Sequence, residues 1–211
     1  ATMADHLAFI YGTEQDRVNC PFYFKIGACR HGEQCTRKHN KPTESQTILF
    51  MNLYQNPYTQ YGPKGEALFD QKASDEHFQN FFWDIFNELV QFGEIEELNC
   101  CSNLGEHLFG NVYCKFYNED SARKALENLM GRFYAGRPVV AELSPVTDFR
   151  EARCRQFDQS TCARGGYCNF MHLRQIDKKL NRLIFDMQRK LWRNRREGRS
   201  SKPKDDDKES R

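Results

Sequence analysis

The stretch CPFYFKIGACRHGEQCTRKH, residues 20–39, carries three cysteines and a histidine at spacings that recur near the other end of the chain. The later stretch is CRQFDQSTCARGGYCNFMH, residues 154–172. In both stretches five residues separate the second cysteine from the third, and three separate the third cysteine from the histidine. Recurrence at fixed spacing indicates two copies of one small structural unit.

Three thiolates and one imidazole suit a zinc ion whose four tetrahedral positions are all filled by protein. A unit of about 20 residues cannot bury enough apolar surface to fold alone, so metal binding would supply its folding free energy. Disulfides are the alternative, but the repeated spacing favours metal. His31 is a competing ligand, disfavoured because the second unit has no histidine at the corresponding place. The sequence therefore predicts two structural Zn²⁺ sites, with these ligands: Cys20, Cys29, Cys35 and His39; Cys154, Cys162, Cys168 and His172.

The same closed coordination argues against catalysis. A catalytic zinc keeps one position open for water, and four protein ligands leave none. No carboxylate pair and no Ser/His/Asp arrangement stands out elsewhere in the sequence. We therefore predict that the protein is not an enzyme.

Composition excludes two further classes. Apolar residues make up 39% of the 211 residues, and no window approaches the ~20 consecutive apolar residues that a membrane span needs. The amino end lacks the apolar region of a signal peptide. Nine cysteines, an odd number, argue against a secreted disulfide framework. We expect a protein of a reducing compartment that binds no membrane.

The formal net charge of +2 conceals an asymmetry. Residues 1–43 carry six basic and four acidic side chains, residues 44–143 seven and fifteen, and residues 144–211 eighteen and ten. Two basic ends around an acidic middle indicate that the ends and the middle bind different partners.

Between the repeats, apolar periodicity predicts the order strand, helix, strand, strand, helix, strand. The fold class is therefore α+β: a βαββαβ sandwich of about 100 residues, flanked by the two zinc units and followed by a basic helix. A loop is expected over 55–73. The strands are expected at 48–54, 94–101, 108–117 and 138–143, and the helices at 74–92 and 119–130.

The spacing of the two zinc units resembles the CCCH zinc-finger family, whose members mostly bind single-stranded RNA. Cations and flat rings alternate between the ligands, which suits unpaired nucleotides because phosphates need positive charge and bases stack on rings. Some of the rings are expected to pack over the thiolates instead, Phe24 above all. At the family's stacking position, two residues after the third cysteine, Phe170 stands in the second finger and Arg37 in the first.

The middle segment resembles the RNA-recognition motif (RRM), whose RNA platform needs aromatic residues on the two central strands. In FGNVYCKF, residues 109–116, Asn111 replaces the usual stacking ring and Phe109 the usual cation. Leu49 stands where the other central strand should carry an aromatic residue. The acidic charge of this segment would also repel phosphates. We therefore expect that its sheet does not bind RNA.

Arg132-Phe133-Tyr134 resembles the Arg-x-Phe loop of U2AF-homology motifs, RRM-like domains that bind a peptide tryptophan rather than RNA. Tyr134 departs from the family, which usually has Phe there. Asp84 and Glu88 lie four residues apart beside the apolar face of the first helix, where they would meet a basic peptide. The resemblance implies a partner-binding pocket formed by all five residues. The alternative is that Phe133 and Tyr134 are ordinary turn and core residues.

The order of the parts, together with SPVTDFREARC at residues 144–154, resembles the small subunits of the U2 auxiliary factor over residues 7–173. This resemblance implies a nuclear pre-mRNA splicing factor that recognises the AG dinucleotide of the 3′ splice site. It also implies a heterodimer with the large subunit, which supplies the peptide tryptophan. The resemblance and the alternation of cations and rings together imply the following RNA contacts: Phe22, Lys25, Arg30, Thr36, Arg37, Lys38, Arg150, Arg155, Arg164, Tyr167 and Phe170.

Three other functions remain as alternatives. In the first, the fingers are structural, and the protein is an interaction subunit whose partner binds the RNA. The second is a zinc ribonuclease, which the closed coordination disfavours. The third is a role in mRNA decay, which the wide separation of the two fingers disfavours.

After the second finger, apolar residues at helical spacing lie among basic ones. This helix either packs back on the RRM-like domain or helps to hold RNA, and the two roles are compatible on opposite faces. Many family members end in Arg/Ser repeats, which are absent from residues 198–211. The predicted divisions are zinc finger 1 at 14–43, the RRM-like domain at 44–143, zinc finger 2 at 148–174, the basic amphipathic helix at 175–196 and a disordered tail at 197–211.

Overall fold

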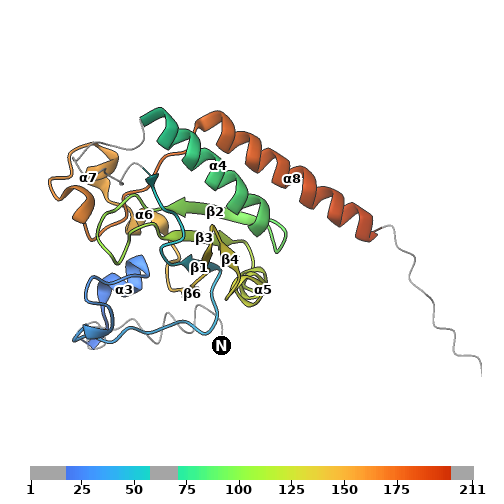
Figure 1. The fold of residues 1–211 in the computed structure, drawn as a ribbon. Coiled ribbons are helices and arrows are strands. Elements are labelled where there is room, and N and C mark those ends of the chain that lie inside the picture. The colour runs from blue at the N-terminus through green and yellow to red at the C-terminus, as the bar shows by residue number, and fades with distance from the viewer. Residues whose placement is uncertain (1–17, 58–70, 201–211) are drawn as a thin grey trace, which may run out of the picture. The chain divides into compact units, whose positions relative to one another are not determined.

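A computed structural model describes residues 18–57 and 71–200, the last three without their side chains. The chain divides into two units, Ala1–Ile176 and Asp177–Arg211 (Figure 1). The first unit contains the sheet and both zinc fingers. No helix in the described residues is long and apolar enough to cross a membrane.

A four-stranded antiparallel sheet of order β2-β3-β1-β6 lies at the centre of the first unit. Helix α4 (Gln71–Leu89) follows β1, and α5 (Glu119–Leu129) follows β3, so the predicted βαββαβ order and the α+β fold class are confirmed (Figure 1). A short hairpin between α5 and β6 was not predicted. The strands are β1 (Thr47–Phe50), β2 (Ile95–Cys100), β3 (Val112–Phe116) and β6 (Ala141–Ser144), with β4 (Phe133–Tyr134) and β5 (Arg137–Pro138) in the hairpin.

Two different layers cover the two faces of this sheet. Side chains alternate between the faces along each strand. Phe50 of β1 lines a pocket with Ile85 of α4 and Leu129 of α5, so the helices cover its face. The neighbouring Leu49 points the other way and belongs to a core with Tyr113 and zinc-finger side chains. The fingers therefore cover the face that the helices leave open.

Several predicted boundaries are wrong, for local reasons. Helix α4 already includes Gln71, so residues 71–73 are helical and not loop. Strand β1 ends at Phe50 because the chain turns at Asn52, which has a φ of 49°. Strand β3 begins only at Val112, after a turn in which a Cβ on Gly110 would lie 2.1 Å from the carbonyl oxygen of Tyr54. Residues 58–70 of the predicted loop lie outside the described residues.

Both fingers have the same local plan, in which a helical turn follows the first cysteine and a 3₁₀ turn follows the second. In finger 1 the Cys20 thiol accepts a hydrogen bond from the Tyr23 N–H at 3.5 Å and caps the first turn. Gly27 ends that turn with a φ of 73°, a left-handed conformation that favours glycine. The elements are α3 (Pro21–Ile26) and η1 (Gly32–Gln34) in finger 1, and α6 (Phe149–Ala152), α7 (Arg155–Asp158) and η3 (Gly165–Tyr167) at finger 2.

The described part of the second unit is one helix, α8 (Lys178–Ser200). The Asp177 carboxylate caps it, accepting hydrogen bonds from the N–H groups of Lys179 at 2.9 Å and Leu180 at 3.0 Å. The predicted C-terminal helix is thus confirmed. It continues through residues 197–200, which were wrongly predicted as disordered. Residues 201–211 of the predicted tail lie outside the described residues.

Candidate functional site

The four side chains predicted as zinc ligands converge in each finger. Their metal-binding atoms lie within 4.8 Å of one another in both clusters. Each of the nine cysteines is free, so no disulfide competes for these thiols. The Nε2 atoms of His39 and His172 are buried, and no described residue offers them a hydrogen-bond partner. Such an atom is costly to bury, and a metal ion at the centre of the cluster would satisfy it. The donor sets therefore fit zinc.

An aromatic ring covers the imidazole in each cluster. The ring of Tyr23 stacks on His39 with centroids 4.5 Å apart, and the ring of Phe157 stacks on His172 at 4.0 Å. Both rings stand three residues after the first cysteine of their finger. Burial lowers the pKa of both imidazoles, which favours the neutral form that binds metal. Tyr23 also shares a small buried cluster with Cys20 and Cys29, whereas the sequence named its neighbour Phe24 as the ring most expected to pack over the thiolates.

Burial also disfavours ionisation of one thiol in each cluster. It raises the pKa of Cys29 to about 11, and it raises the pKa of Cys154. Thiolates are the form that binds metal. A divalent cation supplies the positive charge that makes buried thiolates stable. A bound cation would therefore favour the ionised form of Cys29 and Cys154.

Finger 1 lies directly on the sheet. A Cβ on Gly27 would come within 2.4 Å of the Ser144 hydroxyl and 3.2 Å of the Tyr113 ring. Ile26, fully buried, shares a core with Leu49 and Tyr113. Packing as close as this requires glycine at position 27, and it fixes the orientation of α3 relative to the sheet.

Finger 2 is held by the loop between β2 and β3. Asn103 is only 1% exposed. Its amide nitrogen donates to the carbonyl oxygens of Cys168 at 3.1 Å and Phe170 at 3.0 Å, and its amide oxygen accepts from the N–H of His172 at 2.8 Å. The Ser102 N–H donates to the carbonyl oxygen of His172 at 2.7 Å. Sequence reasoning missed Asn103, because no spacing or periodicity marks an amide that bonds to a segment 65 residues away.

The face on which an RRM usually stacks bases is therefore closed. Tyr113 is 0% exposed and Leu49 is 2% exposed beneath the finger side chains. Asn111, which replaces the usual stacking ring, is buried as well. Its amide accepts a hydrogen bond from the Asn52 N–H at 3.0 Å and donates to the His107 carbonyl oxygen at 2.9 Å. The residues that depart from the RNA-binding pattern thus have packing and turn-forming roles.

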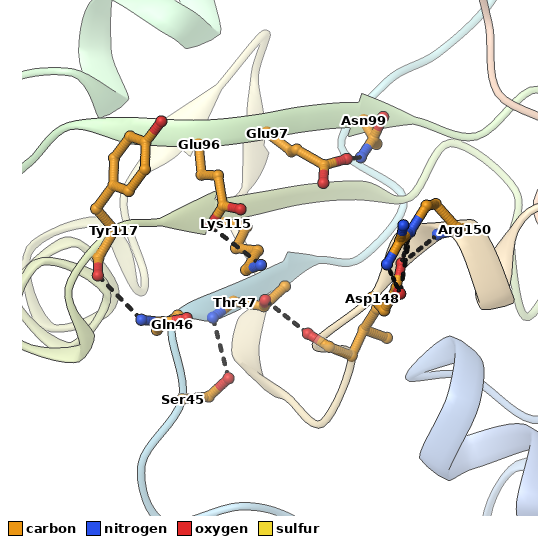
Figure 2. A network of polar contacts seen from close by, with 11 residues as sticks. Ser45, Gln46, Thr47, Glu96, Glu97, Asn99, Lys115, Tyr117, Asp148 and Arg150 are labelled. Atoms are coloured by element: carbon orange, nitrogen blue, oxygen red, sulfur yellow. Dashed lines mark hydrogen bonds and ion pairs between the residues drawn. The ribbon is translucent and has the colours of Figure 1, made fainter. Parts of the chain in front are cut away.

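The rest of this face carries paired charges, as Figure 2 shows. Lys115 of β3 lies 3.0 Å from Glu96 of β2. Arg150, a predicted RNA contact, pairs with Asp148 at 2.7 Å and lowers the pKa of that carboxyl to about 2. The pairing offsets the charge of Arg150, whose side chain is nevertheless 89% exposed. Arg150 should therefore attract a phosphate less strongly than a predicted RNA contact without a carboxylate partner would.

The two fingers touch each other. The rings of Phe22 in finger 1 and Phe170 in finger 2 meet edge to face, with centroids 6.3 Å apart. Phe170 is half-buried against the shared core. The other predicted RNA contacts are exposed: Phe22, Lys25, Arg30, Thr36, Arg37, Lys38, Arg150, Arg155, Arg164 and Tyr167. The two fingers, each with exposed cationic and aromatic side chains, thus meet at one aromatic contact.

A separate pocket of about 240 Å³ opens between α4, α5 and the hairpin, and all five predicted partner-binding residues line it. Arg132 forms an ion pair with Glu88 at 2.6 Å. The ring of Tyr134 meets Phe81 edge to face at 5.9 Å, while Phe133 is 73% exposed. Burial and the nearby charge of Asp84 raise the pKa of Tyr134, which therefore stays neutral. The wall between these residues is apolar and comes from Phe50, Leu53, Ile85, Leu89, Leu129 and Val139.

The hairpin explains how the rim of this pocket forms. Its turn residues, Ala135 and Gly136, have φ values of 47° and 77°. Positive φ at both positions suits the tight turn of a two-residue β-hairpin. The turn pairs Tyr134 with Arg137, whose guanidinium donates to the carbonyl oxygens of Asn52 and Leu53. The hairpin is thereby tied to the end of β1 beside the pocket.

Comparisons with known proteins agree with this arrangement. The model of the C-x8-C-x5-C-x3-H zinc-finger family matches residues 15–41 and 149–174, and that of the RNA recognition motif matches residues 83–140. A solved RNA-binding protein matches 46% of the chain at 18% identity, with a TM-score of 0.29 that is too low to bear on the fold.

Much closer relatives are splicing factors. The chain is 56% identical to the U2AF 23 kDa subunit of Schizosaccharomyces pombe, covering 89% of this chain and 86% of the relative. It is 54% identical to the U2af 38 kDa subunit of Drosophila melanogaster, covering 89% and 73%. It is 54% identical to the U2AF 26 kDa subunit of Rattus norvegicus, covering 87% and 84%. Each of these relatives is named as a splicing factor. The chain therefore belongs to the family of U2AF small subunits.

Proposed function

We propose that this chain is the RNA-reading subunit of a splicing heterodimer, and that its two fingers together recognise the AG dinucleotide of the 3′ splice site. The observation that carries the proposal is the contact between Phe22 and Phe170. Because the fingers touch, exposed cations of both can contribute to a single RNA-binding surface, although about a hundred residues separate the two units in the sequence. One short single-stranded RNA can cross such a surface and meet both fingers.

The chemistry of this surface suits unpaired nucleotides. Exposed guanidinium groups such as those of Arg30, Arg37 and Arg155 attract phosphates and offer donors to base edges. Exposed rings such as Phe22 and Tyr167 can stack on bases, at roughly 1–3 kcal/mol for each base. The packing of both fingers on the sheet positions their backbones in advance, which reduces the entropy lost on binding.

We also propose that each Cys3His cluster holds one structural zinc ion. Zinc, when bound, supplies the ligand bonds that stabilise the fold of a finger too small to fold alone. The ligands then position Arg37 and Phe170, each of which stands two residues after the third cysteine of its finger.

The pocket beside Arg132 is proposed to take a tryptophan side chain from the large subunit. Its apolar wall suits an indole ring, which is both large and flat. Asp84 and Glu88 lie at the rim, where they favour a peptide with basic residues beside its tryptophan. This site is separate from the finger surface, so one chain can hold RNA and its partner together. A role in splicing further implies a nuclear location.

Calorimetry of the purified heterodimer with two short RNAs that differ only in the AG dinucleotide tests this function. We expect the AG-containing RNA to bind roughly 10- to 100-fold more tightly, since one wrong base costs about 1–3 kcal/mol in specific complexes. The two RNAs should be compared at the same salt concentration, because phosphate contacts contribute equally to both. Equal affinity for the two RNAs would rule out AG recognition.

One observation favours the alternative of structural fingers. Ile26 of finger 1 and Met171 of finger 2 are core residues that share a cluster with the sheet residue Tyr113. On that alternative the fingers stabilise the RRM-like domain, and the large subunit alone binds RNA. The exposure of the predicted RNA contacts supports the first proposal instead, because purely structural fingers have no need of so many exposed cations.

A further inference from the structure

Helix α8 has a strongly one-sided charge. Over Lys178–Ser200 the sequence has nine basic residues and two acidic ones. Successive residues turn by about 100° around a helix axis. On that basis, five cations fall within a strip about 60° wide. These residues form what we call the basic stripe: Lys178, Arg182, Arg189, Arg193 and Arg196, all of them exposed.

The arrangement is unfavourable for the helix by itself. Lys178 and Arg182 are four residues apart, as are Arg189 and Arg193, and like charges at this spacing destabilise a helix by several tenths of a kcal/mol. Arg189 is paired with Asp186. Within the described ranges, no ion pair is formed by Lys178, Arg182 or Arg193. A polyanion that binds along the stripe would turn this repulsion into attraction.

The length of chain between finger 2 and α8 limits the distance from finger 2 to the start of the stripe. Asp177, the cap of α8, is five residues beyond the ligand His172. Five residues span at most about 18 Å even when fully extended. From that point the helix runs for about 34 Å, at 1.5 Å per residue. Whatever orientation α8 takes, its basic stripe therefore begins within reach of an RNA strand that leaves finger 2.

We propose that the basic stripe of α8 binds the phosphates of the same RNA strand, outside the nucleotides that the fingers hold. This inference rests on the proposed RNA-binding function of the fingers and extends the RNA site beyond them. The contacts are to phosphate and not to bases, so they add affinity without sequence preference. An acidic protein segment is the other polyanion that would fit such a stripe.

The test compares two double variants in the heterodimer. Lys178→Gln with Arg193→Gln removes two charges from the stripe. Lys179→Gln with Lys190→Gln removes two charges from exposed positions turned about 60–100° away around the helix. Each protein is titrated, at several salt concentrations, with a short AG-containing RNA and with the same RNA extended by about ten uridines on each side.

We expect the wild-type protein to bind the extended RNA more tightly than the short one. The stripe variant should lose most of that gain. For the extended RNA, the slope of its log affinity against log salt concentration should be shallower by about 1.4, because two phosphate contacts are lost. Neither variant should bind the short RNA differently from the wild-type protein. The control variant should keep at least half of the gain from extension.

Three results would overturn the proposal. The first is an unchanged salt slope and an unchanged gain from extension in the stripe variant. The second is an equal loss in both variants, which would indicate net charge and not the stripe. The third is weaker binding of the large subunit with RNA affinity unchanged, which would identify an acidic protein segment as the ligand. Failure of the wild-type protein to bind the short RNA would instead contradict the proposed function of the fingers.

Discussion

Replacing His39 by alanine should reduce the zinc content of the protein from two ions to one and remove most of its RNA affinity. Binding of structural zinc is worth roughly 10–16 kcal/mol in finger peptides, which exceeds the whole stability of many domains. Finger 1 should therefore unfold, and its exposed cations and Phe22 would no longer be held in position to bind RNA. We expect RNA to bind at least 100-fold more weakly, a loss of about 2.7 kcal/mol or more. Zinc is measured by mass spectrometry of the native protein.

The matched control for this variant is His31→Ala. His31 lies in the same finger but is exposed and outside the ligand cluster. The control should keep two zinc ions and nearly all of the RNA affinity. Loss of one zinc ion from the His31 variant, with two ions kept in the His39 variant, would contradict the ligand assignment.

Loss of zinc from finger 1 should lower the thermal stability of the protein but leave its partner-binding pocket in place. Unfolding of finger 1 uncovers Leu49 and Tyr113, so the Tm of the His39 variant should fall. The partner pocket lies on the opposite side of the sheet, between α4 and α5. The variant should therefore still bind the large subunit at temperatures below its unfolding transition.

Reversing the charges at the pocket rim should separate the subunits while RNA binding by this chain persists. The double variant Asp84→Lys and Glu88→Lys removes the pairing of Glu88 with Arg132 and surrounds that guanidinium with like charge. A basic peptide would then be repelled from a pocket that formerly attracted it. We expect the affinity for a tryptophan-containing segment of the large subunit to fall by about 100-fold or more, as at interface hot spots.

The control is Glu127→Lys on α5, an exposed position that does not line the pocket. It makes the same kind of charge change and should leave the affinity for the partner nearly unchanged. Titration calorimetry with the isolated segment measures both variants. Wild-type affinity in the double variant would show that the pocket is not the partner site.

Sequence reasoning predicted the parts of this molecule better than the way in which they meet. Ligand spacing and apolar periodicity are local patterns, so the two clusters and the βαββαβ order followed from them. Asn103 and Gly27 act through residues far away in the sequence. Asn103 lies outside both repeats, and Gly27 lies inside the first one but is not among the repeated ligands. The contact between Phe22 and Phe170 depends on the packing of finger 1 at Gly27 and of finger 2 at Asn103, so no local pattern indicates it.

Errors in the boundaries have a similar origin. The segment from Ile48 to Tyr54 is apolar except for Asn52, but the chain turns at Asn52 and Tyr54 packs against α4. Tertiary packing overrides local propensity there. In finger 1 Tyr23 and Phe24 are neighbouring rings, and only the three-dimensional path of the finger determines which of them covers the histidine.

We expect that the fingers of this chain, and not the large subunit alone, bind the RNA. The most direct measurement is the RNA affinity of the heterodimer that carries Arg37→Ala with Arg164→Ala, one exposed arginine from each finger. The control carries Arg123→Ala with Lys124→Ala, two exposed cations on α5. We expect the finger variant to bind AG-containing RNA at least 10-fold more weakly while the heterodimer and the control stay intact. Unchanged RNA affinity in the finger variant would contradict the claim.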